Sequence, residues 1–171
     1  MTKPRVFTKE DRYDPVHCVE FSVDHLNTAE VLFATGFRFF DSVGYLAHMG
    51  GELLLKAWLP ELTGQFEGVH SLQSLHTELV RDHGAPALDA AQSELLRILD
   101  EYGELRYPAP NPPEVGNENW AAMKALIQDI AALIPDRLFE DLEKVPQARK
   151  GARIVMQKKR RDGEHPARAN D

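Results

Sequence analysis

Apolar residues recur at steps of three and four along most of this chain, the spacing that places side chains on one face of an α-helix. The longest such run spans residues 39–59. Its apolar face carries Phe40, Val43, Ala47, Gly50, Leu54 and Trp58. A polar stripe runs beside that face, formed by Asp41, Tyr45, His48 and Glu52. We therefore predict a central helix that packs on more than one side and carries polar groups where chemistry can occur.

Similar spacing predicts further helices on both sides of this one. A first helix is expected from Asp24 or Asn27 to about Thr35, and the later ones over 70–81, 88–102, 120–134 and 136–144. The central helix is expected to end at Pro60, and residues 36–38 to join it to the first helix as an αα-hairpin. No strand-type alternation of any length is evident. The pattern predicts an all-α antiparallel bundle of five or six helices.

Three glycines lie inside the predicted central helix, at Gly44, Gly50 and Gly51. Each costs up to about 1 kcal/mol relative to alanine in a helix interior. The expected compensation is close approach of neighbouring helices.

The chain of 171 residues suits one domain, and its 43% of apolar residues suffices for a core. We divide it into an N-terminal arm (1–19), the bundle (20–145) and a basic tail (146–171). From residue 144 onward the charge is +6, whereas the rest carries −13. An acidic body repels nucleic acid and a basic tail attracts it, so charge argues neither for nor against an RNA partner. The simplest view of the tail is a solvated, flexible end.

Cysteine content and hydropathy bear on the compartment. Cys18 is the single cysteine, so no internal disulfide can form, and we expect it to be a small buried side chain. No apolar run approaches the roughly 20 residues that span a bilayer, and residues 1–10 lack a hydrophobic signal region. We expect a cytoplasmic protein without a membrane partner, and nothing in the pattern calls for a cofactor.

Two places on the helices could carry chemistry. His48 and Glu52 lie four apart, a spacing that can place an imidazole and a carboxylate on one metal, with Asp24 and His25 completing the site. The alternative is that they pair with each other or with a neighbouring helix, and without a second matching pair we predict no metal. Glu52 and Lys56 form an i,i+4 pair that would organise a polar site if buried.

Arg106 and Tyr107 begin a loop in which four prolines follow within residues 108–113. A guanidinium and an aromatic ring on a stiff loop suit phosphate contact and base stacking. Alternatively, Tyr107 packs over the end of the bundle while Arg106 bonds helix carbonyls.

Three stretches in this order resemble a known family. Residues 23–33 (VDHLNTAEVLF) are similar to an opening helix of the pattern D-L-x-x-A-E-x-L. Residues 46–59 (LAHMGGELLLKAWL) and then 68–75 (GVHSLQSL) resemble Q-x-A-E-K-x-L-K-A-L-L and H-S-L-x-x-L. Residues 99–108 (LDEYGELRYP) resemble Y-x-x-x-R-Y-P. Together they resemble the HEPN domain, a small helical bundle, over roughly residues 20–134.

Many HEPN proteins are metal-independent ribonucleases with an R-x(4-6)-H motif, in which the arginine holds phosphate and the histidine transfers a proton. This chain departs from that pattern, because no histidine follows Arg106 at four to six residues. Arg160 and His165 have the spacing but lie in the polar tail, and we treat them as coincidental. The resemblance is thus to the non-nuclease branch.

That branch implies a homodimeric nucleotide- or RNA-binding accessory module in a prokaryotic defence or toxin-antitoxin setting, with a partner protein such as a nucleotidyltransferase. The expected ligand contacts are Arg38, Lys56, Arg106 and Tyr107. One alternative is a ribonuclease in which Arg106 meets His48 or His70 in the fold. Another is a structural dimerisation domain without a ligand.

Overall fold

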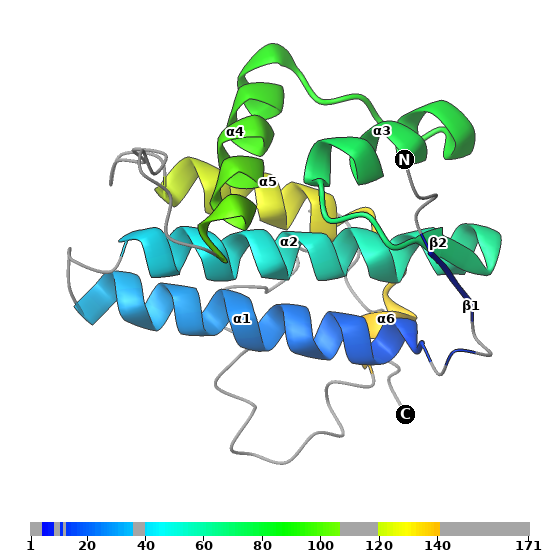
Figure 1. The fold of residues 1–171 in the computed structure, drawn as a ribbon, viewed down its shortest axis with the longest axis horizontal. Helices are drawn as coiled ribbons and strands as arrows, with labels where there is room; N and C mark the ends of the chain where they lie inside the picture. Colours follow the sequence, from blue (N-terminus) through cyan, green and yellow to red (C-terminus); the bar gives the residue numbers. More distant parts are fainter. Residues whose placement is uncertain (1–4, 9–10, 12, 36–39, 107–119, 141–171) are drawn as a thin grey trace, which may run out of the picture.

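The computed structural model describes residues 5–8, 11, 13–35, 40–106 and 120–140 (Figure 1). The described elements are β1 (Val6–Thr8), α1 (Pro15–Thr35), α2 (Phe40–Thr63), β2 (Gln65–Glu67), α3 (Leu72–His83), α4 (Ala90–Glu101), the 3-10 helix η3 (Tyr102–Arg106), α5 (Trp120–Ala131) and α6 (Arg137–Glu140). The predicted all-α bundle is confirmed. No helix in the described part of the chain is long and apolar enough to cross a membrane.

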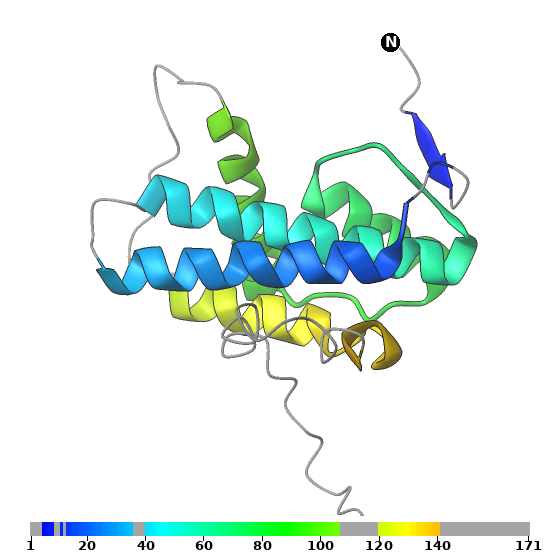
Figure 2. The same cartoon turned by 90° about the horizontal axis from the view of Figure 1, so that it is seen from below.

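The two longest helices, α1 and α2, lie antiparallel along each other, as both views show (Figures 1 and 2). The predicted start of the first helix at Asp24 or Asn27 was wrong, because α1 already begins at Pro15. Proline is tolerated in a first helical turn, and the Asp14 side chain accepts a 2.9 Å hydrogen bond from the Val16 amide. The predicted arm over residues 1–19 therefore contains the first turn of the bundle.

Helix α2 also continues past its predicted end, because Pro60 lies inside it. Near a helix end proline removes only one backbone hydrogen bond, and the Gly64 amide still donates to the Pro60 carbonyl at 2.8 Å. Gly64 has a φ of 77°, a conformation that L-residues rarely adopt, and it follows the last residue of the helix.

Side-chain caps define the two helices that follow. Ser71 caps α3 by accepting from the Ser74 amide, and Gly84 ends α3 in the left-handed conformation, as its sequence position predicted. Asp89 and Gln92 form a reciprocal capping box at the start of α4. These caps place α4 from 90 to 101 rather than 88 to 102, and η3 follows it directly.

A short antiparallel ladder was missed by the sequence pattern. β1 pairs with β2, with Phe7 opposite Phe66, and three residues are too few to show alternation. The Phe7 and Phe66 rings stack with their centroids 5.2 Å apart, and the Tyr13 ring lies 4.2 Å from Phe66. Lys56 Nζ of α2 lies 5.5 Å from the centre of the Phe66 ring, so this aromatic group packs beside α2.

Helix α5 closes the bundle against α1. The Trp120 ring is buried against Phe33, and its indole nitrogen donates to Glu30 at 2.8 Å. Lys124 also binds Glu30, at 3.0 Å. Trp58 and Cys18 are buried too, so the predicted core role of both tryptophans and of the cysteine is confirmed. The sixth helix is described only over Arg137–Glu140, and its predicted remainder and the basic tail lie outside the described residues.

The predicted close approach at the α2 glycines is confirmed where α2 meets α1 and η3. A Cβ at Gly50 would lie 2.5 Å from the Leu26 side chain, and one at Gly44 would overlap the Tyr102 ring. Gly51 has room for ordinary contact with Leu72. Gly44 and Gly50 thus set the distance between α2 and its neighbours.

Candidate functional site: a buried polar column and the cleft beside it

Three ionisable side chains form a buried column on one face of α2. His48, Glu52 and Lys56 lie at successive steps of four, which stacks them along the helix. Their exposed fractions are only 1%, 3% and 6%. Buried charges are costly unless they are paired, so this column must be organised by its partners.

Glu52 is the centre of the column. Its Oε1 atom accepts from Lys56 Nζ at 2.5 Å and from His70 Nδ1 at 2.9 Å, while its Oε2 atom lies 3.5 Å from His48 Nε2. Burial alone would raise the pKa of the Glu52 carboxyl, but its interactions with His48, Lys56 and His70 hold that pKa at about 2. Glu52 is therefore a carboxylate across the physiological range.

His48 connects this carboxylate to α4. Its Nδ1 atom lies 3.1 Å from the Leu99 carbonyl oxygen and 3.8 Å from Asp100 Oδ1. Both ring nitrogens thus face oxygen atoms, although within the described part of the chain Nε2 has no hydrogen-bond partner. Gly103 makes room for the ring, since a Cβ there would come within 2.6 Å of it.

Asp100 in turn holds the beginning of α3. Its carboxylate accepts from the Ser71 hydroxyl at 2.7 Å and from the Leu72 amide at 2.8 Å. A carboxylate at a helix N-terminus satisfies an amide that the helix leaves unpaired and interacts favourably with the helix dipole. The column and Asp100 together tie α2, α3 and α4 to one another.

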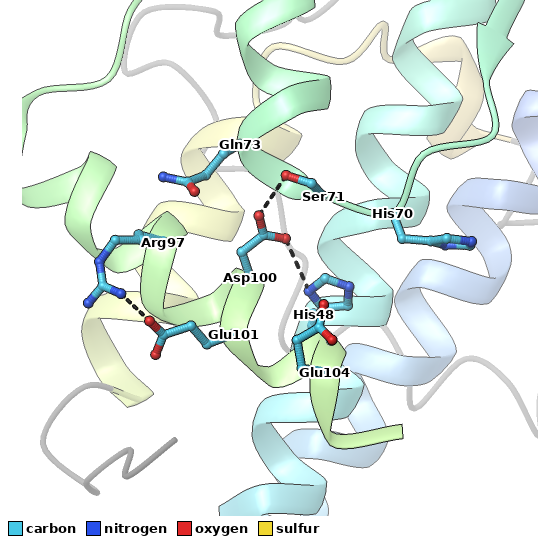
Figure 3. A pocket seen from close by; sticks show the side chains of 9 residues that line it. His48, His70, Ser71, Gln73, Arg97, Asp100, Glu101 and Glu104 are labelled. Atoms are coloured by element: carbon cyan, nitrogen blue, oxygen red, sulfur yellow. Dashed lines mark hydrogen bonds and ion pairs between the residues drawn. The ribbon is translucent and has the colours of Figure 1, made fainter. Parts of the chain in front are cut away.

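A cleft of about 450 Å³ opens beside this network, in the size range of small-molecule sites. Its described lining consists of polar residues and one glycine: His48, His70, Ser71, Gln73, Arg97, Asp100, Glu101, Gly103 and Glu104. In Figure 3, Asp100 and His48 lie at the centre, with Arg97 and Glu101 on one side and His70 on the other. Arg97 is held by Glu94 at 2.7 Å and by Glu101.

Among the described residues, no group of three or more histidine, cysteine, aspartate or glutamate side chains could hold a metal ion. Asp24 and His25 lie on α1 and do not join His48 and Glu52 in such a group. The Glu52 carboxylate instead takes Lys56 and His70 as its partners.

Comparison with protein-family models agrees with this architecture. The HEPN domain model matches residues 18–134, more than two thirds of the chain. The chain belongs to the HEPN domain family. No curated protein and no solved structure matches it.

The HEPN domain brings together some of the predicted site residues. His48 and His70 both line the cleft and both contact Glu52, and the Glu52–Lys56 pair, whose burial the sequence left open, is buried. Lys56 is therefore committed to an internal ion pair. Arg106 ends η3, but its side chain lies outside the described part, as do Arg38 and Tyr107 altogether.

Sequence reasoning missed the α4 side of the site. Asp100 is the key residue there, and nothing in the local pattern distinguishes it from a solvent-exposed aspartate. The sequence could have identified Ser71, because a serine just before an apolar-periodic run is a typical helix cap. Arg97 and Glu101 also had a signal, an i,i+4 charge pair on a predicted helix.

Proposed function

We propose that this HEPN domain is a nucleotide- or RNA-binding module whose site is the cleft between α2, α3 and α4. The observation that carries the proposal is the combination of a cleft of about 450 Å³ with a rigid, buried network behind it. Preorganised polar groups recognise a ligand at lower entropic cost than mobile ones. His70 and Gln73 extend this polar surface into solvent, where a ligand can reach it.

The charges of the cleft favour the base and ribose over the phosphates. Glu101 and Glu104 line the cleft, and carboxylates accept hydrogen bonds from ribose hydroxyls and exocyclic amines. Arg97 is already paired with Glu94 and Glu101, so it does not offer an unshared cation to phosphate. We therefore expect nucleosides to bind about as well as their triphosphates.

Isothermal titration of nucleosides, nucleotides and short single-stranded RNAs tests this proposal. Gln73→Ala should weaken binding, because the amide is exposed in the cleft, where a ligand can reach it. Gln65→Ala is the matched control, since Gln65 is an exposed glutamine on β2. The proposal would be contradicted if Gln73→Ala left the affinity unchanged, or if none of these ligands bound.

A second function is favoured by one contact, the 2.9 Å hydrogen bond between His70 Nδ1 and Glu52. A carboxylate that orients an accessible imidazole is a recurring arrangement in general acid–base catalysis. His70 is 58% exposed and lines the cleft, so it could transfer a proton in metal-independent RNA cleavage. The phosphate-binding arginine of this ribonuclease would be Arg106, whose side chain lies outside the described part of the chain.

Incubation of the protein with mixed RNA, with and without EDTA, separates the two functions. Cleavage that survives EDTA and is lost in His70→Gln would establish the ribonuclease. Intact RNA under both conditions would rule out the ribonuclease and keep the binding module as the proposed function. A melting temperature unmoved by nucleotides and RNA would favour the ligand-free structural domain.

The expected assembly and setting also belong to this proposal. The family resemblance supports a homodimer and a partner such as a nucleotidyltransferase in a defence or toxin-antitoxin system. Sedimentation velocity of the full chain tests the dimer, and a single monomeric species at working concentrations would rule it out.

A further inference from the structure

A second cleft lies farther along α3, between the C-terminal half of that helix, the following loop and α4. Its volume is about 250 Å³, and its described lining is His76, Thr77, Val80, Arg81, Ala87, Leu88 and Ser93. None of these residues is acidic, whereas three carboxylates line the first cleft. The two clefts therefore differ in the charge of the ligand that they suit.

His76 gives this cleft an unused polar group. The side chain is 7% exposed, and within the described part of the chain its Nε2 atom has no hydrogen-bond partner. Burial lowers the pKa of His76, and the nearby Pro86 backbone offsets this only in part. A buried polar atom without a partner is costly, and native structures seldom leave one without a reason.

The other polar groups of the cleft are hydrogen-bond donors. Thr77 on α3 and Ser93 on α4 are exposed and contribute hydroxyls from facing helices. Arg81 adds a guanidinium whose Nε and Nη2 atoms bind Asp82, while Nη1 takes no part in that pair. Val80, Ala87 and Leu88 supply apolar walls, which lower the local polarity and strengthen charged hydrogen bonds.

We propose that this second cleft binds a small phosphate group, which accepts hydrogen bonds from Arg81, Thr77 and Ser93 and donates one from its P–OH to His76 Nε2 beneath it. Two hydroxyls and a guanidinium around one small volume match the several oxygens of a phosphate. The site is independent of the nucleoside site proposed above, because none of its lining residues belongs to the first cleft. Either proposal can therefore fail alone.

Titration with inorganic phosphate, followed by amide NMR shifts of the full chain, tests the site. We expect saturable shifts at Thr77, Arg81 and Ser93. Thr77→Val and Ser93→Ala should each weaken phosphate binding about 10-fold, the usual effect of losing one hydrogen bond to a charged group. Both side chains are exposed, so these variants should fold.

Two further variants keep the proposal falsifiable. His76→Gln should weaken binding. Arg137→Gln should have no effect, because Arg137 is an exposed arginine of α6 paired with Glu61, and α6 packs against α1 and contributes no residue to the described lining of the cleft. Shifts that do not saturate, shifts centred elsewhere, or equal affinity in the Thr77→Val, Ser93→Ala and parent proteins would overturn the proposal.

Discussion

Two sets of ion pairs at the first cleft use the same kinds of side chains in different surroundings. We call the buried column of His48, Glu52 and Lys56 behind the cleft its floor, and the ion pairs of Arg97 at its edge its rim. On the floor, Glu52 binds Lys56 and His70 with 4% of its own side chain exposed. On the rim, Arg97 binds Glu94 and Glu101 with about half of each side chain exposed. Water weakens the second set and hardly reaches the first. Similar ion pairs should therefore differ greatly in what they contribute.

Substitution at Glu52 should have the largest effect. Glu52→Gln leaves Lys56 as a buried cation without its counter-charge, and breaking a buried pair from one side typically costs about 3–5 kcal/mol. Urea unfolding monitored by circular dichroism measures this loss. The matched control is Glu94→Gln on the rim, for which we expect less than about 1 kcal/mol. Equal losses in the two variants would contradict the comparison.

Low pH should destabilise the floor through Glu52. The pKa of Glu52 is held at about 2, below its usual 4.5, so the folded state favours the ionised form. Its stabilising contribution is complete above about pH 4.5 and is lost as the pH falls from there toward 2. The parent should lose more stability than Glu52→Gln between pH 6 and pH 3, as measured by urea unfolding at each pH. Parallel pH profiles would show that Glu52 is not the group responsible.

The loss of stability in Asp100→Asn should lie between those of Glu52→Gln and Arg97→Ala. Asp100→Asn removes the negative charge at the start of α3 and weakens its bonds to Ser71 and the Leu72 amide. Loss of a cap costs about 0.5–2 kcal/mol. Hydrogen exchange should show faster opening in the first turn of α3 and little change in α5. Uniform acceleration over both helices would mean that Asp100 supports the whole fold.

The smallest effect is expected on the rim. Arg97→Ala removes two exposed ion pairs, which together should change the free energy of unfolding by less than about 1 kcal/mol. Thermal unfolding at low and high salt measures the difference, which should shrink as salt increases. A loss comparable to that of Glu52→Gln would place Arg97 in the structural network.

Some features of this site were accessible from the sequence and others were not. The spacing of His48, Glu52 and Lys56 placed them on one helix face, because helical periodicity is local. Whether that face meets solvent or another helix depends on segments distant in the chain, here α3 and α4. Pro60 and Pro15 illustrate the same limit, since the cost of a proline depends on its position relative to helix ends that packing decides.

The sequence by itself determined the helical class, the end of α3 at Gly84 and the family, because each depends on short-range patterns. Only the tertiary structure decided that Asp100 meets Ser71 and His48, since 29 residues separate Asp100 from Ser71 and 51 separate His48 from Leu99. Contacts of this kind arise when helices bury their apolar faces together, and the polar groups that are carried inside must then find partners in one another.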